Sequence, residues 1–422
     1  MGRHTAIVRL ITQPSTRTLI HRTSLSIYPV DNDVTYECSS EIDSNYFTTP
    51  TNSNTFKNAS LITTQVVSLP QNSPFAKSMW KGSCMLGQLT PKGAEQQERM
   101  GRGLRRVYVD RLGFLPDEFD QEKFFVRSTD VWRTRQSATS LMTGLYPTNC
   151  PNTPPPTLRI TTLPKELEYL TFNEGDQCPR VGQLKTLIGQ SNPTLQNFYT
   201  HIPAPIIAAS QIIDYPNSIS VDKVSDFVSP RVCLDRPMPC IKDPNGSGEE
   251  RCVDGKAVME AMAEYRSTES GAMLRDDTKS FELLKVGYGP AVGLLKRNVV
   301  GGEGKEGGED VVFSLYSGHD TMILPLLAVL ESVDMRWPPY AANILFELWE
   351  TPTEERYIRV LYNNRVVITK SNWCDLSWCP LQTFLEHLDK FLPGEDYLEK
   401  CQEQPKRMPK YSNLAPYQSD VK

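Results

Sequence analysis

The sequence predicts an α/β core built from two separate parts of the chain, with a mainly helical segment inserted between them. Two observations predict this arrangement. A strand-turn-helix pattern occurs near residue 130 and again near residue 320, and the stretch between the two patterns is rich in proline and in short helical pieces. We therefore assign residues 1–147 and 277–422 to the core and residues 148–276 to a helical cap, with an atypical segment at residues 1–30.

The first strand-turn-helix pattern lies in the stretch KFFVRSTDVWRTRQSATSLMTGLYP, residues 123–147. Phe124–Val126 is an apolar run of strand type, and a polar turn and a helix with small residues on one face follow it. Arg127 closes the strand, and Arg133 and Arg135 follow in the helix. The pattern therefore places Arg127 at the carboxyl end of a strand.

The inserted segment begins with proline-rich loops at residues 151–156. Short amphipathic pieces follow at Gly182–Ile188 and Leu195–Ile202, and Val253–Arg266 is a clearer helix. The stretch GGEGKEGG, residues 301–308, is expected to form a flexible surface loop just before the second pattern. These features favour a helical insertion over a continuation of the sheet.

The second pattern is the most informative stretch of the chain. Val311–Tyr316 is a β-branched and aromatic run of the kind that forms a strand buried on both faces, and Ser317-Gly318 ends it. Asp320 stands where a helix N-cap is expected, ahead of the apolar run Met322–Leu330. His319 and Asp320 are thus predicted at the carboxyl edge of a sheet, where open α/β folds bind ligands and a helix N-terminus favours an anion. Asp320 could also serve only as a cap.

The remaining elements complete the predicted core. Ile344–Trp349 and Tyr357–Tyr362 alternate as paired strands, and the Asn363-Asn364 turn leads into a third strand at Arg365–Thr369. Leu381–Phe391 is the last predicted helix. We therefore expect a hairpin at the Asn363-Asn364 turn.

The composition excludes several classes of protein. Charged residues make up 23% of the 422 residues, the formal net charge is −5, and no basic run occurs, so we expect no nucleic-acid partner. No stretch has the length and apolarity of a membrane span. The first 30 residues also lack a signal-peptide pattern, and we expect that the natural N-terminus is missing from this chain.

The cysteines point to an oxidising compartment. The chain has ten cysteines without a convincing metal spacing, so we expect no metal site and up to five disulfides. Cys240–Cys252 and Cys374–Cys379 are plausible local pairs, although spacing alone does not fix connectivity. Two glycosylation acceptor triplets, at Asn58 and Asn245, agree with a secretory-pathway or extracellular location.

Together these motifs resemble the histidine acid phosphatase family. The likeness is carried by the motif RSTD-x-x-R-T-x-x-S-A, which begins at Arg127, by YSGHDT, which begins at Tyr316, and by CMLGQLTPKGAEQQERMGRGLR, WPPYAANILFELW and CPLQTFLEHL. It extends from about Tyr36 to Cys401, and it is greatest to the branch that contains 2-phosphoxylose phosphatase and fungal acid phosphatase-like proteins. The resemblance implies a phosphoglycerate-mutase-like α/β core with a mainly helical cap.

The resemblance also implies an activity and site residues. The family hydrolyses phosphate monoesters through a phosphohistidine intermediate without a cofactor or metal, so the expected partner is a phosphorylated small molecule or sugar. Arg127 matches the family's distal phosphate-binding arginine, His319 the histidine that hydrogen-bonds the phosphoryl group, and Asp320 the proton donor. A guanidinium can hold two phosphate oxygens at once, which suits the role assigned to Arg127.

The family's nucleophile motif, R-H-G-x-R-x-P, does not occur in this chain, so the nucleophile is unknown. His4 follows Arg3 but has too few residues before it for a strand, whereas His21 follows the strand-like Leu19-Ile20, and Arg22 could correspond to the motif's second arginine. Two functions compete on these grounds. One is a phosphomonoesterase whose nucleophile motif is missing or broken here; the other is an inactive relative that keeps the phosphate pocket as a binding module. A purely structural interaction protein has no positive feature in its favour.

Overall fold

A computed structural model describes most of the chain. The described residues are 7–12, 22–28, 30–31, 34–38, 41–43, 64–66, 80–147, 157–164, 167–170, 178–214, 217–242, 249–275, 278–300, 308 and 310–402. The two glycosylation triplets and most of the glycine-rich stretch 301–308 lie outside these ranges.

A mixed sheet of eight strands forms the centre of the molecule, in the order β13-β12-β11-β1-β10-β6-β7, with β14 paired to β12. The strands β1, β10, β6 and β7 run parallel to one another, and β11, β12 and β13 form an antiparallel extension beyond β1. The carboxyl ends of parallel strands meet at one edge, so Ser317 of β10 lies beside Ser128 of β6 in register. That edge is where the two strand-turn-helix patterns meet.

The strands of the described residues, which also form three small two-stranded pairs, are β1 (Ile7–Thr12), β2 (Thr35–Tyr36), β3 (Glu41–Asp43), β4 (Thr64–Val66), β5 (Lys81–Gly82), β6 (Phe124–Ser128), β7 (Ile160–Thr161), β8 (Cys240–Lys242), β9 (Glu250–Cys252), β10 (Phe313–Ser317), β11 (Asn343–Glu350), β12 (Arg356–Tyr362), β13 (Arg365–Val366) and β14 (Cys379–Pro380). The helices are α1 (Pro91–Leu104), continued by the π-helix η5 (Arg105–Arg111), the 3₁₀ turn η6 (Gln121–Lys123), α2 (Trp132–Leu145), α3 (Pro179–Ser191), α4 (Pro193–Thr200), α5 (Ala204–Ile213), α6 (Val221–Cys233), α7 (Gly255–Arg275), α8 (Thr278–Val300), α9 (Asp320–Val329), α10 (Leu381–Asp389) and α11 (Tyr397–Gln402).

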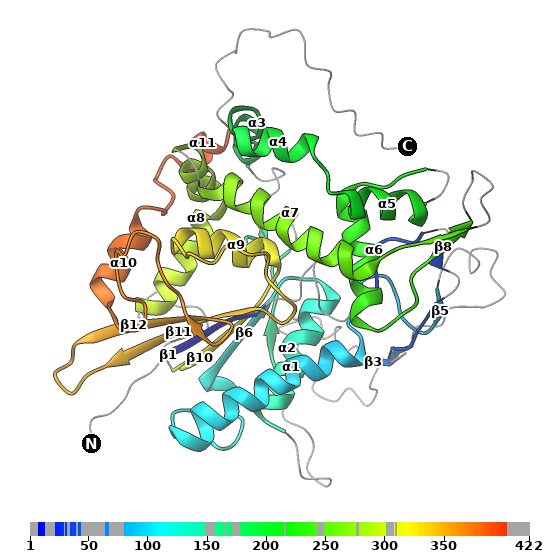
Figure 1. Ribbon diagram of the computed structural model, residues 1–422. Coiled ribbons are helices and arrows are strands. Elements are labelled where there is room, and N and C mark those ends of the chain that lie inside the picture. The colour runs from blue at the N-terminus through cyan, green and yellow to red at the C-terminus, as the bar shows by residue number, and fades with distance from the viewer. Residues whose placement is uncertain are drawn as a thin grey trace.

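Helices cover both faces of the sheet (Figure 1). On one face, α1 and α2 pack through apolar side chains of α2, such as Leu141 and Leu145, onto Phe124, Val126 and Leu315 of the central strands. The two helices approach each other closely at Gly101 and Gly144, because a Cβ at Gly101 would lie only 2.0 Å from the Leu141 carbonyl oxygen. Large side chains at either position would push α1 away from α2.

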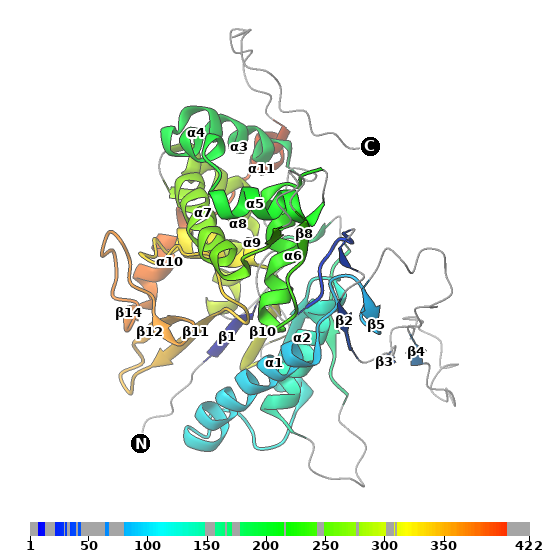
Figure 2. The same ribbon diagram turned by 45° about the vertical axis from the view of Figure 1, so that its right-hand side comes forward.

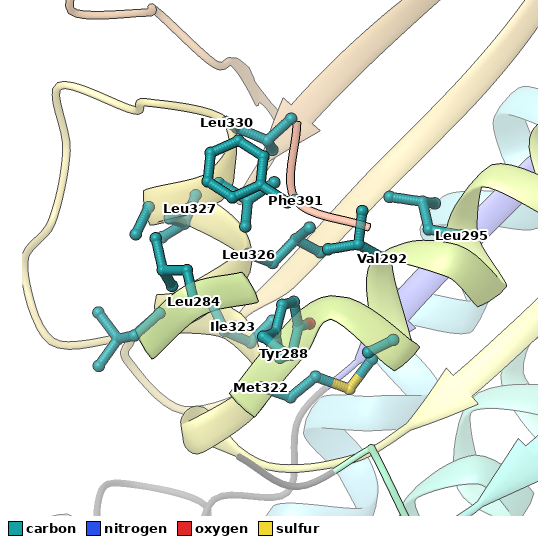
Figure 3. Packing of buried hydrophobic residues seen from close by; sticks show 14 of the residues in the cluster. Leu284, Tyr288, Val292, Leu295, Met322, Ile323, Leu326, Leu327, Leu330 and Phe391 are labelled. Atoms are coloured by element: carbon teal, nitrogen blue, oxygen red, sulfur yellow. The ribbon is translucent and has the colours of Figure 1, made fainter. Parts of the chain in front are cut away.

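On the other face, α8 and α9 form the largest buried cluster together with the sheet. Figure 3 shows Met322, Ile323 and Leu326 of α9 packed against Tyr288 and Val292 of α8. The face of α9 that carries these residues is fully apolar, which explains why the run Met322–Leu330 folds as a buried helix.

The helices between β7 and α8 stand beyond the carboxyl edge of the sheet (Figures 1 and 2). A separate buried cluster joins α5, α6 and α7, and Tyr28 of the N-terminal segment packs edge-on against Phe227 of α6 at a ring-centroid distance of 5.2 Å. The α/β core with a mainly helical insertion is thereby confirmed. The division at residues 147 and 277 stays a prediction, since α3 and α8 share one buried cluster.

The two strand-turn-helix patterns have the predicted form. Val126 of β6 pairs with Leu315 of β10, as the prediction of one shared sheet requires. The helix boundary at Asp320 was predicted one residue too late: His319 is the N-cap, and Asp320 is the first residue of α9. A carboxylate in the first turn is stabilised by the positive end of the helix dipole, so Asp320 is favourable there without capping. The hairpin at the Asn363-Asn364 turn is also confirmed, with both residues at positive φ, although its second strand ends at Val366 and not at Thr369.

Four disulfides connect the described cysteines. Cys240–Cys252 and Cys374–Cys379 were expected, and Cys38–Cys84 and Cys178–Cys401 join cysteines that lie far apart in the sequence. Cys233 is free, and Cys150 lies outside the described ranges. Four disulfides fit a protein of an oxidising compartment. Within the described residues, no helix has the length and apolarity needed to cross a bilayer.

The Cys178–Cys401 disulfide is expected to stabilise the fold most, because it spans 223 residues and fixes α11 beside α3. The chain-entropy relation gives about 5 kcal/mol for a loop of this length and about 3 kcal/mol for the 12-residue separation of Cys240–Cys252. Cys178→Ser/Cys401→Ser should therefore lower the free energy of unfolding by about 2 kcal/mol more than Cys240→Ser/Cys252→Ser. Urea denaturation of the two double variants checks this, and equal losses would contradict it.

Candidate active site

His319 and Asp320 lie at the carboxyl edge of the sheet, as predicted. His319 directly follows the β10-to-α9 turn, and both side chains are buried, with His319 3% and Asp320 0% exposed. The turn leaves little room for a side chain: a Cβ at Gly318 would lie 2.8 Å from the Met322 sulfur and 3.3 Å from the Leu170 carbonyl oxygen. The space around Gly318 therefore favours glycine at this turn, and His319 and Asp320 follow it directly.

The neighbouring strand-turn-helix motif holds the imidazole of His319. Its Nε2 lies 3.0 Å from the Thr129 hydroxyl, which in turn donates to the Thr134 hydroxyl over 3.0 Å. The Thr129 N–H donates to the Ser317 carbonyl, and the Ser317 hydroxyl donates to the Thr134 carbonyl. These buried hydrogen bonds lock the two turns together, so His319 has a defined orientation.

Arg133 is a buried cation whose charge interacts with that of Asp320. It is the second residue of α2 and is 7% exposed, and its Nε has no hydrogen-bond partner among the described residues. The pKa of Arg133 is lowered to about 10, first by burial and then by the positive charge of Arg22, while the charges of Asp320 and Asp226 oppose this. The four charged groups are thus close enough to act on one another.

Arg22 is the second cation of the site. It is 2% exposed and lies 2.9 Å from the Asp226 carboxylate, measured from Nη1 to Oδ1. The backbone around Arg22 pairs with Leu89, and Gly87 donates its N–H to the Ser24 carbonyl. Gly87 has φ +62°, and a Cβ there would collide with Leu25 at 2.5 Å, so the turn that presses this segment against α2 requires glycine.

Asp226 connects the site to the helical insertion. It lies on α6, and besides its ion pair with Arg22 it accepts a hydrogen bond from the Leu25 N–H over 2.8 Å. The Ser24 hydroxyl also donates to the Asp226 carbonyl. Nothing in the sequence around Asp226 predicts a site residue, because its partners lie about 200 positions earlier in the chain.

Arg127 occupies a different environment from Arg133. Its guanidinium lies 3.0 Å from the Glu168 carboxylate and stacks over Tyr169, with Cζ 4.4 Å from the ring centroid. Strand alternation explains the difference: Arg127 shares a face with Tyr316 and Phe125, whereas Val126 and Leu315 face α2. The role of Arg127 in phosphate binding stays a prediction. From the sequence, Arg133 is assigned to the helix without a role in the site, although Arg133 is the second arginine of the same RSTD-x-x-R-T motif.

The assembled charges suit an oxyanion. Arg22 and Arg133 repel each other; Asp226 pairs with Arg22, and the charges of Asp320 and Asp226 both act on Arg133. An anion between the two guanidinium groups would relieve this repulsion and accept charge-assisted hydrogen bonds from both. The N-terminus of α9 adds its dipole at the same edge.

The remaining histidines fall into two groups. His4 and His21 lie outside the described residues. His201 is exposed at the end of α4, where its ring Nδ1 lies 2.9 Å from the Asn197 carbonyl oxygen. His387 is buried on α10, stacked on Trp373 with a centroid distance of 3.7 Å, and its Nε2–H donates to the Val329 carbonyl over 2.7 Å.

His387 is expected to make the fold less stable at acidic pH. Burial lowers the pKa of His387, and Lys390 adds to this, while the hydrogen bond to Val329 and the charge of Glu331 oppose it. As the pH falls through about 6.5, the unfolded chain gains a proton that the folded chain binds more weakly, so stability is lost until the lower folded pKa is reached. His387→Gln should show a smaller loss between pH 7 and pH 5 than the unmodified protein in urea titrations. His201→Gln is the control, and equal slopes for all three proteins would refute the assignment.

Comparison with known proteins identifies the family of this chain. The sequence pattern described as the histidine phosphatase superfamily (branch 2) matches residues 39–222 and 269–363. Human lysophosphatidic acid phosphatase type 6 is 25% identical over 337 residues, which cover 79% of this chain and 73% of that protein. Human 2-phosphoxylose phosphatase 1 is 25% identical over 346 residues, covering 75% and 66%. Among solved structures, the apo phytase of Hafnia alvei has a TM-score of 0.53 at 15% identity, over 94% of this chain and 98% of that one.

The chain therefore belongs to the histidine phosphatase superfamily, branch 2, because the family pattern matches well over half of it. This confirms the family assignment made from the Arg127 and Tyr316 motifs, and the phytase likeness confirms the fold. Membership and the phosphatase relatives support classification as a phosphoric monoester hydrolase.

Proposed function

We propose that the protein binds the phosphoryl group of a phosphate monoester at the edge formed by β6 and β10. Arg22 and Arg133 hold the phosphoryl oxygens, and His319 donates a hydrogen bond from the ring that Thr129 orients. Asp320, at the first position of α9, is placed to give a proton to the leaving alcohol oxygen. Arg127 is retained as a further candidate cation from the sequence motif.

The convergence of Arg22 and Arg133 with Asp320 and Asp226 is the observation that supports this most. Buried like charges are costly unless a ligand or partner compensates them. Here two arginines from segments over 100 residues apart act on each other in a buried setting. A phosphate dianion compensates both, and binding it explains why the fold keeps the two cations together.

The attacking group of the reaction is the part of the proposal that the chain leaves open. Among the described residues, His319 is the imidazole of the proposed site; Thr129 holds its ring, and we assign it to the phosphoryl oxygens and not to attack on phosphorus. The sheet position between β10 and β11 is taken by β1, so His21 does not directly follow that strand. We infer that the nucleophile motif is missing or broken in this chain. The alternative is a relative that keeps the pocket only to bind phosphate.

The substrate is proposed to be a phosphorylated small molecule or a phosphorylated sugar. The names of the relatives point to a lysophosphatidic acid in one and to 2-phosphoxylose in another, each of which carries one phosphate monoester. Together with the disulfides, the relatives favour action in the secretory pathway or outside the cell.

Calorimetric titration with inorganic phosphate at pH 5 tests the proposal independently of turnover. The protein is expected to bind phosphate at a single site. Arg22→Gln should weaken this binding, whereas Arg180→Gln should not, because Arg180 pairs with Glu282 between α3 and α8. Absence of phosphate binding in the unmodified, folded protein would refute the proposed function.

A further inference from the structure

A cavity opens directly beside the catalytic end of α9. Its volume is about 570 Å³, and it lies between α9 and the insertion helices α3, α4 and α7. Thr321 forms its edge, and the N–H of Thr321 donates to the Asp320 carboxylate over 2.9 Å. The cavity therefore begins one residue from the proposed proton donor. Cavities of roughly 300–1,000 Å³ commonly hold small-molecule ligands.

The walls of this cavity are mainly apolar. Leu324 and Pro325 of α9 and Met273 and Leu274 of α7 contribute aliphatic surface, and the rings of Tyr199 and Trp337 complete it. The opposite face of α9 does not line the cavity: Met322, Ile323 and Leu326 pack against α8 (Figure 3). Contact between this apolar surface and water is unfavourable, and an apolar ligand bound in the cavity would cover the surface.

The charges in the lining cancel each other. Lys185 and Glu269 are the two residues of opposite formal charge among the described lining residues. A substrate with several phosphate groups would need several cations here, in the way that Arg22 and Arg133 serve the first phosphate. The described lining offers a single lysine and one glutamate, so it does not suit a second phosphate.

The loop after α9 contributes Trp337 to the cavity wall. Trp337 lines the cavity, and its backbone N–H donates to the Ser267 hydroxyl of α7 over 3.0 Å. After Pro338 and Pro339, Tyr340 has its pKa raised well above the usual range, first by burial, then by Cys233, with Arg22 and Asp226 also acting on it. Pro338 and Pro339 restrict the backbone between Trp337 and Tyr340.

We propose that this cavity receives the alcohol part of the substrate, and that the substrate is a phosphomonoester of an apolar or aromatic alcohol rather than a polyphosphorylated polyol. The inference rests on the proposed function, because the phosphate at Arg22 and Arg133 anchors the ligand. The ester oxygen then lies at Asp320, and the apolar group extends past Thr321 onto Leu324 and Pro325. Burial of that group supplies affinity that phosphate alone lacks.

A binding comparison tests this without requiring turnover. Inorganic phosphate, methylphosphonate, octylphosphonate and inositol hexakisphosphate are titrated calorimetrically into the full chain. Octylphosphonate should bind at least about tenfold more tightly than methylphosphonate, equivalent to about 1.4 kcal/mol. Gly189→Phe fills the cavity from α3, where an added Cβ meets only Tyr199 at 3.6 Å, and should abolish the preference while leaving inorganic phosphate affinity unchanged.

Gly182→Phe is the matched control. It makes the same substitution two turns earlier on α3, where an added Cβ meets nothing within 4 Å, and it should keep the preference. Equal affinities of octylphosphonate and methylphosphonate, with phosphate still bound, would overturn the cavity assignment and leave the proposed function standing. Tighter binding of inositol hexakisphosphate than of octylphosphonate would overturn it too. If no phosphate or phosphonate binds, the proposed function fails and the inference falls with it.

Discussion

Replacing Arg133 by alanine is expected to weaken phosphate binding at least about a hundredfold, equivalent to about 2.7 kcal/mol. The guanidinium is buried, its Nε has no hydrogen-bond partner among the described residues, and its charge acts on Asp320 and Arg22. Without the Arg133 guanidinium, a buried phosphate oxygen has no hydrogen-bond donor in the protein and is still kept from water, which costs binding free energy. Calorimetric titration of the variant with phosphate or vanadate measures the effect.

Two further variants make this result specific. Arg102→Ala removes an exposed arginine that pairs with Glu98 on α1, and it should leave phosphate affinity unchanged. Arg127→Ala breaks a buried pair with Glu168 and should lower the free energy of unfolding by about 3–5 kcal/mol. We expect a smaller effect of Arg127→Ala than of Arg133→Ala on the affinity of the folded protein. The reverse order would support the sequence-based assignment of Arg127 as the phosphate-binding arginine.

The chain is expected to hydrolyse a simple phosphomonoester at least about a thousandfold more slowly than a variant in which Arg-His-Gly-Asp is inserted before Arg22. Arg22, Arg133 and His319 can stabilise the phosphoryl charge, and Asp320 can supply a proton, yet no covalent intermediate forms without a positioned imidazole. A covalent intermediate would divide the hydrolysis into two easier steps, whereas direct attack by water must pass the single, higher barrier. Assays at acidic pH on both proteins measure the difference.

His21 provides the control for this experiment, because it directly precedes Arg22. If the unmodified chain turned over as fast as the insertion variant, and His21→Ala abolished that turnover, His21 would be the nucleophile. The inference of a broken motif would then be wrong. If both proteins lacked activity but bound phosphate, the binding-module alternative would gain support.

The elements predicted from sequence were those with strong local signals. Buried β-branched runs at β6, β10 and β11 could be recognised because strands covered on both faces tolerate few polar residues. The positions of His319 and Asp320 followed from the turn between β10 and α9. The central strand β1 had no such signal, since IVRLIT lies within a polar, weakly periodic N-terminal region.

The rest of the site depends on contacts between distant segments. Arg22 approaches Asp226 only because the 22–25 segment pairs with residues 87–89 and packs on α6. Spacing within one element cannot reveal such a pair. The choice between Arg127 and Arg133 likewise required the faces of β6 and the direction of α2, because both arginines belong to one motif.

A crystal structure of the protein with bound orthovanadate tests the central claim most directly. The account predicts the vanadate within hydrogen-bonding distance of the guanidinium groups of Arg22 and Arg133, with the imidazole of His319 and the carboxyl of Asp320 beside it. Arg127 should remain paired with Glu168. A vanadate bound between Arg127 and Tyr169, or bound away from the β6–β10 edge, would contradict the account.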